Sequence, residues 1–395
     1  MSWRTTSPMD ERKRFIQEWR AAAEPVTALC ARYGISRKTG YKLLARYEAE
    51  GWGALSERSR ARHHQPHAVS RAVERAVVEV RGAHPRWGPR KVRAWLQRRR
   101  AAESWPAAST IGAVLKRHGL VGARQRHGPA APATQPLAGA VGPNDVWSTD
   151  FKGWFRTGDG QRCLPFTLTD NASRYVLRCQ AVPTGDEAAV RPLVEAAFRE
   201  YGLPRALRSD NGPPFASTAV AGLTALAVWW IRLGIVPERI APGHPEQNGR
   251  HERFHLTLQQ ETAQPPAATG RGQQRRFDAF RREFNEERPH EGIALQVPAA
   301  LYPASPRPYP ARLPAVEYPG SWGVRRVRSN GEIRWAGALL YVSAALRGED
   351  LGLEEVHEDC WRVRFGPVVL GWVDTRRPTR SRRRPAPKLL PMCPV

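Results

Sequence analysis

The sequence has few cysteines and no long hydrophobic run. Its five cysteines are scattered and odd in number, and no two form a Cys-x-x-Cys pair. This pattern indicates reduced thiols and argues against a disulfide framework or a zinc site. His63, His64 and His67 lack nearby cysteines or acids to complete a metal site, so we interpret them as part of a basic polar linker. No apolar run approaches the ~18 residues that span a membrane, and the first residues lack a signal-peptide apolar region. We therefore expect a soluble, cytoplasmic protein.

Acidic residues are also few compared with basic residues. The chain has 37 Asp and Glu against 62 Lys and Arg, which gives a formal net charge of +25. Residues 1–143 alone hold 27 basic and 10 acidic side chains. Basic side chains beside phosphates release condensed counterions. We therefore expect nucleic acid as the partner, held mainly by the first third of the chain.

Three carboxylates lie at positions where a role in solubility does not explain their presence. Asp150 and Asp210 follow short segments rich in apolar or β-forming residues, and Glu246 lies in the stretch 242–249. A strand end can hold an acid beside a cleft without burying it in the core. Hard cations such as Mg²⁺ prefer oxygen ligands, and two ions about 3.5–4 Å apart can activate a water and stabilise the leaving oxygen of a phosphodiester. The three acids therefore predict metal-dependent phosphodiester chemistry.

The order and spacing of these acids are more specific than any single motif. Asp150 and Asp210 are separated by 59 residues, and Asp210 and Glu246 by 35. The flanking motifs are Trp147-x-x-Asp150, Ser209-Asp210-Asn211-Gly212 and Pro245-x-x-Asn248-Gly249-x-x-Glu252-Arg253. In these residues the sequence resembles the integrase-core transposases of bacterial insertion sequences, relatives of retroviral integrase.

The resemblance implies a ribonuclease-H-like core in which Asp150, Asp210 and Glu246 bind two Mg²⁺ ions, with Mn²⁺ as an alternative. It implies a DNA transposase that binds the ends of a mobile element, cuts them to leave 3′-hydroxyls, and joins these to target DNA. Because two ends are joined in one event, it also implies a homo-oligomer on double-stranded DNA. The expected location is the bacterial cytoplasm, in association with the nucleoid.

Residues 11–48 have the apolar spacing of three helices, and Gly34 interrupts it before Ser36, a good N-cap. A break followed by a cap is typical of a helix-turn-helix, whose second helix meets base edges in the major groove. The alternative is an ordinary solvated helix face. The candidate DNA contacts on this helix are Arg37, Lys38, Lys42 and Arg46.

A second helical unit follows the basic connector. Its apolar stripes and Ser109, a predicted helix cap, indicate another helix-turn-helix with Lys116 and Arg117 facing outward as candidate DNA contacts. Trp87 and Trp95 lie in or beside the apolar stripes. We therefore expect them in the core rather than stacked on bases.

The region after Asn144 alternates between strand-like and helical patterns. The predicted strands are at 145–151, 162–169, 174–182 and 205–209, and the predicted helices at 187–201 and 217–233. The helix at 217–233 is apolar nearly all round and should be buried. Strands followed by alternating helix and strand indicate an α/β layered domain.

Pro245 is suited to a first helical turn, so we expect Glu246 to start a helix. Arg250 and Arg253 follow Glu246 at i+4 and i+7 on one helical face. Arginines beside a metal-binding acid suit incoming DNA, and a salt bridge on a solvated surface is the alternative. A further helix is predicted near 277–286.

Residues 322–375 contain short alternating apolar runs, with Asn330-Gly331 as a hairpin signal. This pattern predicts a small β-barrel or SH3-like unit. The arginine-rich ending predicts a disordered basic tail that holds phosphates.

These features predict a multidomain protein with α-helical helix-turn-helix units, an α/β ribonuclease-H-like core and a small C-terminal β-barrel. The predicted divisions are a helix-turn-helix domain at 1–56, a second at 57–121, a linker at 122–143, the catalytic core at 144–302, a linker at 303–319, the β-barrel at 320–376 and the tail at 377–395.

Two other functions stay open at this point. One is a metal-dependent nuclease that cuts DNA without joining it, which the two helix-turn-helix units disfavour. The other is an inactive DNA-binding regulator derived from a transposase, which the intact set of three acids disfavours.

Overall fold

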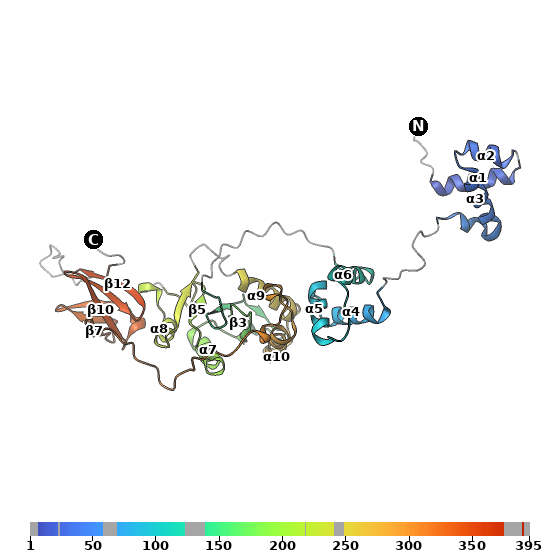
Figure 1. Cartoon of the computed structure of the whole chain (residues 1–395). Coiled ribbons are helices and arrows are strands. Elements are labelled where there is room, and N and C mark those ends of the chain that lie inside the picture. Colours follow the sequence, from blue (N-terminus) through green and yellow to red (C-terminus); the bar gives the residue numbers. More distant parts are fainter. Residues whose placement is uncertain are drawn as a thin grey trace. The chain divides into compact units, whose positions relative to one another are not determined.

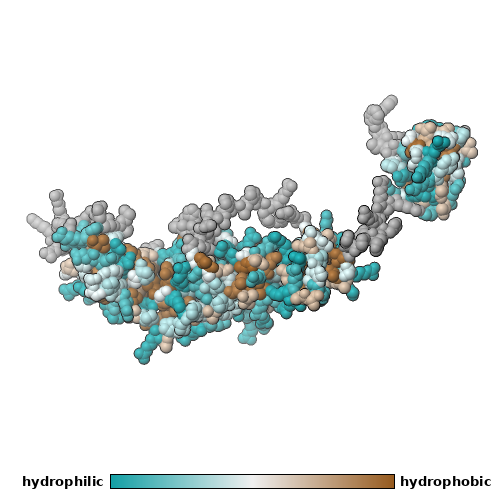
Figure 2. All heavy atoms as spheres, in the orientation of Figure 1, coloured by the Kyte–Doolittle hydropathy of each residue, from teal (hydrophilic) through white to brown (hydrophobic). Residues whose placement is uncertain are grey.

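The computed structural model describes residues 7–22, 24–57, 69–122, 139–217, 219–240, 249–374 and 389–390. The chain divides into two compact units, Met1–Ser70 and Arg71–Val395, whose elements are drawn in Figure 1. The visible face is largely hydrophilic (Figure 2). Within the described ranges no helix combines the length and apolar character needed to cross a membrane. Outside these ranges lie His63, His64, His67 and most of the predicted linker 122–143 and tail 377–395.

The described residues of the first unit form three helices and a short 3₁₀ turn. They are α1 Pro8–Arg20, α2 Val26–Arg32, α3 Arg37–Glu50 and η1 Gly51–Leu55. Apolar side chains from all four elements form one buried core. Gly40 allows α3 to approach α2 closely, because a Cβ at this position would collide with Sγ of Cys30. The helical spacing read from the sequence is confirmed.

Ser36 caps α3 as predicted, since its Oγ accepts a hydrogen bond from the Thr39 amide at 3.1 Å. Replacing Ser36 by Ala leaves that amide without its cap, and we expect α3 to lose about 1 kcal/mol of stability. Amide hydrogen exchange of the full chain, read at residues 37–50, measures this loss. Ser36→Thr keeps the hydroxyl and should exchange nearly as the wild type does. Unchanged exchange in Ser36→Ala would contradict the prediction.

Three helices also begin the second unit: α4 Arg71–Ala83, α5 Pro89–Arg99 and α6 Ala108–Arg117. Trp87 is buried and stacks on His84 with ring centres 3.8 Å apart, which confirms its predicted core position. Trp95 is half-buried. The predicted cap at Ser109 is wrong, because α6 begins earlier and its N-cap is Ala107, which has no side-chain oxygen.

A mixed sheet forms the middle of this unit. Its strands are β1 Val146–Phe151, β2 Phe155–Arg156, β3 Arg162–Asp170, β4 Val176–Val182, β5 Ala206–Ser209 and β6 Val236–Arg239. The order is β2-β3-β1-β5-β6, and β4 also pairs with β3. β3 is antiparallel to both β1 and β4. β5 runs parallel to β1, and the unpredicted β6 runs parallel to β5.

Two helices pack with the sheet around its main core: α7 Glu187–Tyr201 and α8 Ala225–Arg232. The boundaries of α7 match the prediction, because Asp186 caps its start and Gly202, at φ 78°, ends it. The predicted helix 217–233 is too long. The chain first makes the 3₁₀ turn η2 Val220–Gly222, and α8 begins only after Thr224, whose side chain caps it.

A second pair of helices, α9 Gly249–Thr262 and α10 Gly270–Arg282, packs with Cys163, Val176 and Cys179 of the sheet around another core. The helix predicted near 277–286 corresponds to α10, which begins earlier, at Gly270. It continues as a π-helical turn, η4 Glu283–Glu287, and two 3₁₀ turns follow, η5 Glu291–Ile293 and η6 Pro298–Ala300.

Two side chains of this helical segment form hydrogen bonds with backbone groups on the outer edge of β4. Asn285 accepts from the Val176 amide at 2.8 Å and donates to the Val176 carbonyl at 3.0 Å. Gln274 pairs in the same way with the Ala181 amide and the Cys179 carbonyl. An edge strand presents unpaired backbone groups, and these side chains satisfy four of them.

The last folded part is made of short strands: β7 Gly323–Arg326, β8 Glu332–Trp335, β9 Ala338–Tyr341, β10 Asp350–His357, β11 Cys360–Phe365 and β12 Val368–Asp374, with η7 Ala344–Leu346 between β9 and β10. One sheet has the order β12-β11-β10-β7, and β8 pairs with β9 alone. A small β unit is confirmed. A closed barrel is not, since no ladder joins the two sheets among the described residues.

The hairpin signal at Asn330-Gly331 is a wrong prediction. These residues turn the chain between β7 and β8, which do not pair with each other. The hairpin turn lies instead between β8 and β9 at Ala336 and Gly337, both with positive φ.

α8 is buried on opposite sides by two different cores, as its all-round apolar pattern predicts. Leu226, Trp229 and Trp230 pack into the core of the mixed sheet. Ala227, Val228 and Ile231 pack into the core of the C-terminal β unit. The helix therefore joins these two parts of the chain through apolar contacts.

Candidate active site

Asp150 and Asp210 stand at corresponding places on neighbouring parallel strands. In the β1–β5 ladder, Ser148 lies opposite Arg208, and each aspartate comes two residues further along its strand. Because the two strands run in the same direction, both acids lie where the strands end, at one edge of the sheet. The fold thus brings together two acids separated by 59 residues in the sequence.

Asp210 carries a buried carboxylate oxygen, Oδ1, that has no hydrogen-bond partner among the residues that the structure describes. Burial raises the pKa of this carboxyl, while the backbone N–H of Gly212 acts in the opposite direction. A buried carboxylate oxygen without a donor is unfavourable. A cation bound to Oδ1 would supply the missing interaction.

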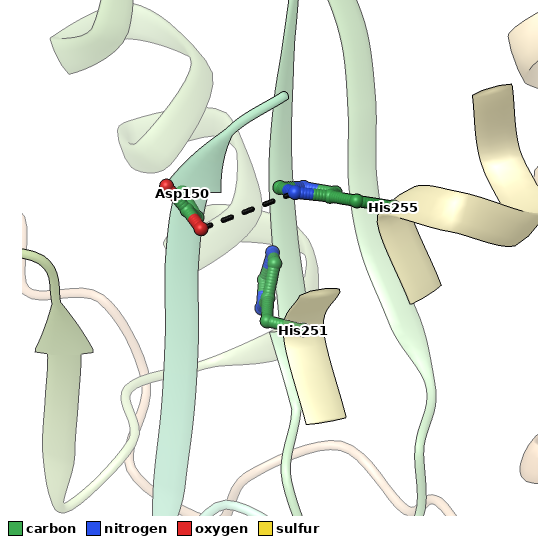
Figure 3. A group of neighbouring side chains, drawn as sticks. All are labelled: Asp150, His251 and His255. Carbon is green, nitrogen blue, oxygen red and sulfur yellow. Dashed lines mark ion pairs between the residues drawn. The ribbon is translucent and has the colours of Figure 1, made fainter. Parts of the chain in front are cut away.

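Asp150 is anchored at the end of β1, with its side chain 16% exposed. Its Oδ1 accepts a hydrogen bond from the Phe151 amide at 2.7 Å. Its Oδ2 lies 3.9 Å from Nδ1 of His255 on α9 (dashed in Figure 3). The carboxylate therefore points toward the buried face of that helix.

Two histidines of α9 lie beside Asp150 (Figure 3). His251 and His255 are buried, and the Nε2 atom of each contacts Oγ1 of Thr167 on β3, at 2.7 and 2.8 Å. Burial lowers the pKa of His251 to about 3 and, with the neighbouring His251 and Lys152 adding to the effect, lowers the pKa of His255 to about 2. Both imidazoles are therefore neutral at pH 7.

These residues fit a divalent cation. Asp150 and Asp210 offer carboxylate oxygens, and Mg²⁺ is commonly held by one or two carboxylates while waters and phosphates complete its shell. The orphaned Oδ1 of Asp210 is an available ligand. Among the described residues, Asp150, His251 and His255 also have ligand atoms within 4.8 Å of one another.

Glu246, the third predicted acid, lies in the stretch 241–248 outside the described residues, so its role and the helix start assigned to it stay predictions. The helix expected after it is present as α9, which continues through Phe254 and Leu258. Arg250 and Arg253 are both exposed on α9.

The predicted DNA contacts of the first unit differ in their surroundings. Arg37, Lys38 and Lys42 of α3 are exposed. Arg46 is half-buried, and its guanidinium donates to the backbone carbonyls of Ala54 and Ser56. Arg46 thus holds η1 against α3, a structural role that the sequence did not predict.

The predicted contacts of the second helical unit lie at the end of α6. Lys116 and Arg117 are exposed, and Arg117 pairs with Glu74 of α4 at 2.5 Å. The DNA contacts predicted for Lys116 and Arg117, like those of α3, stay predictions.

Sequence reasoning missed His251, His255 and Thr167. The i,i+4 spacing of the two histidines was the available signal, because it places both on one face of the helix after Glu246. It also missed Trp154, which is 54% exposed shortly after Asp150. The guanidinium of Arg162 lies 5.2 Å from the Trp154 ring centre, so a basic and aromatic surface follows the strand of Asp150.

Domains of known protein families match the two helical regions and the region of the mixed sheet. Integrase core domains match residues 140–245 and 233–298. A helix-turn-helix domain matches residues 11–63, and a homeodomain-like domain matches residues 39–115.

Two insertion-element proteins are similar to the chain. An uncharacterized 39.2 kDa protein of insertion element IS476 from Xanthomonas euvesicatoria is 30% identical over 249 residues, which cover 61% of this chain and 67% of that protein. An uncharacterized 31.7 kDa protein of IS407 from Burkholderia multivorans is 28% identical over 166 residues, covering 42% and 57%. Among solved structures, the catalytic core domain of BIV integrase aligns with 40% of this chain and 92% of its own, at 21% identity and a TM-score of 0.31.

Proposed function

Because the chain belongs to the integrase-core transposases of bacterial insertion sequences, we propose that it cuts the ends of a mobile element by metal-dependent hydrolysis and joins the resulting 3′-hydroxyls to target DNA. The observation that supports this most is the placement of Asp150 and Asp210. They lie at the ends of neighbouring parallel strands, and within the described part of the chain a buried oxygen of Asp210 lacks a hydrogen-bond partner.

In this proposal Asp150, Asp210 and Glu246 hold two Mg²⁺ ions, with Mn²⁺ as an alternative. Bound ions supply a water of lowered pKa and stabilise charge on the phosphodiester oxygens. In the cut, the water oxygen bonds to phosphorus, the bond from phosphorus to the 3′ oxygen breaks, and a proton passes to that oxygen. In the joining step, the 3′-hydroxyl loses its proton and bonds to a target phosphorus, while the bond from that phosphorus to its own 3′ oxygen breaks and this oxygen takes up a proton.

Such transfer needs positioning and charge stabilisation rather than a covalent protein intermediate. The carboxylates meet this need because the sheet fixes the strands that carry Asp150 and Asp210.

DNA binding is assigned to the exposed basic residues outside the acid cluster. Arg37, Lys38 and Lys42, at the start of α3, are proposed to meet base edges of the element end, as the second helix of a helix-turn-helix does. The proposed phosphate contacts are Lys116, Arg117, Arg250 and Arg253, while Arg46 keeps the structural role described above. Two ends must be held in one event, so the active form is proposed to be a homo-oligomer on double-stranded DNA.

A strand-transfer assay tests this function. Purified protein, Mg²⁺, a labelled duplex carrying the element end and a target plasmid are expected to give joined product, and a chelator is expected to abolish it. Cut duplex without joined product would favour a metal-dependent nuclease. Metal-independent binding without cutting would favour an inactive regulator.

A further inference from the structure

The hydroxyl of Thr167 fixes the proton positions of two buried imidazoles. Its Oγ1 lies 3.0 Å from the carbonyl oxygen of Asp150, 2.7 Å from Nε2 of His251 and 2.8 Å from Nε2 of His255. A hydroxyl has one proton to donate and two lone pairs that accept. The carbonyl oxygen only accepts, so the Thr167 proton goes to it. Both imidazoles therefore donate an Nε2–H to Thr167.

This count leaves Nδ1 of each neutral ring as an acceptor. Nδ1 of His251 lies 3.4 Å from Oγ1 of Thr169, which donates to it. Nδ1 of His255 instead faces Oδ2 of Asp150 at 3.9 Å (Figure 3). His255 is buried, with 5% of the residue exposed. Two acceptors therefore face each other across a distance too long for a hydrogen bond.

We propose that Asp150 and His255 together bind one divalent cation, with Oδ2 of the carboxylate and Nδ1 of the imidazole as ligands. The inference rests on the proposed function, because Asp150 belongs to the site proposed for phosphodiester chemistry. It adds a nitrogen ligand to a site whose other proposed ligands are carboxylates. His251 shares the Thr167 hydroxyl with His255 and helps to hold it, but is not a ligand itself.

The two atoms are close to the separation that one cation requires. Ligand atoms about 2.1 Å from a metal lie roughly 3.0–3.4 Å apart in octahedral or tetrahedral sites. The observed 3.9 Å is longer by roughly 0.5–0.9 Å, a gap that a rotation of either side chain would have to close. A metal-binding histidine commonly donates its other N–H to a partner that fixes its tautomer, and Thr167 is that partner here.

The identity of the ligands also predicts which metals the site prefers. Mg²⁺ favours carboxylate and water oxygens, whereas imidazole suits Zn²⁺ and other transition metals. A site with a carboxylate and an imidazole should therefore bind Co²⁺ or Zn²⁺ more tightly than Mg²⁺, and His255→Gln should reduce this preference. Competition between Mg²⁺ and Co²⁺ for the full chain measures it.

Pulsed electron paramagnetic resonance of the full chain with one equivalent of Mn²⁺ tests the ligand directly. Coupling of the metal to an imidazole nitrogen is expected in the wild type and is expected to be lost in His255→Gln and Asp150→Asn. Binding of Mn²⁺ to these two variants should weaken by at least the roughly 10- to 100-fold that loss of an outer-shell partner of a metal ligand costs. His251→Gln is the matched control, because His251 lies on the same helix, is also buried and also contacts Thr167. The coupling of the metal to an imidazole nitrogen should remain in the His251→Gln variant.

An absence of nitrogen coupling in the wild type overturns the inference. Coupling that survives both His255→Gln and Asp150→Asn also overturns it, because another histidine is then its source. Thermal melting without metal shows whether each variant folds, and His255→Asn takes the place of His255→Gln where that variant does not fold. Joining of DNA without nitrogen coupling leaves the proposed function standing. Nitrogen coupling without joining removes the proposed function and keeps the metal site.

Discussion

Replacing Asp150 by Asn is expected to lower cutting and joining roughly 10³-fold or more, about 4 kcal/mol of transition-state stabilisation, and to leave binding of element ends nearly unchanged. Asn has almost the same size as Asp but carries no charge for a cation. The residues proposed to read DNA sequence lie on α3, in the other compact unit of the chain. Initial rates in the strand-transfer assay and the Kd of a labelled end measure the two properties separately.

Asp210→Asn and Glu246→Gln should give the same separation of activity from binding. The matched control is Asp145→Asn, just before β1, where the Asp145 carboxylate accepts from the Gly142 amide at 2.8 Å and lies 3.6 Å from Arg205. That variant should keep its joining activity. If Asp150→Asn lost end binding along with activity, separate roles for the acid cluster and the DNA-reading helices would be wrong. If it kept joining DNA, Asp150 would not belong to the site.

The parts of the fold that sequence predicted well are those with strong local signals. α7 was placed correctly because an amphipathic stripe lies between a capping Asp186 and Gly202, which adopts a positive φ. Asp150 and Asp210 were placed at strand ends because each follows a short apolar segment. Such signals depend only on residues near one another in the chain.

The parts that sequence missed depend on packing between distant segments. His251 and His255 meet Thr167 across 84 and 88 residues, and this contact exists only because α9 packs on β3. The predicted helix 217–233 was too long because a continuous apolar run does not reveal the Thr224 cap inside it. Arg46 was assigned to DNA by its charge, yet carbonyls of η1 bind its guanidinium.

A large effect on stability is expected from Asn285→Ala. The Asn285 side chain is buried and bonds both the amide and the carbonyl of Val176 on the outer edge of β4. Alanine leaves both backbone groups buried without a partner, at a cost of roughly 1–3 kcal/mol each. We therefore expect a loss of roughly 2–6 kcal/mol. Hydrogen exchange of the Val176 amide and thermal melting of the full chain measure it.

Gln274→Ala is the matched control, because Gln274 makes the same two kinds of bond to the same edge of β4 but is only half-buried. Water can replace its side chain there, so the loss should be smaller than for Asn285→Ala. Asn285→Asp should lose at least as much as Asn285→Ala, since its carboxylate accepts from the Val176 amide but is a buried charge that meets the Val176 carbonyl oxygen as a second acceptor. Equal losses for Asn285→Ala and Gln274→Ala would show that burial does not set the cost, and that any side chain along this edge contributes alike.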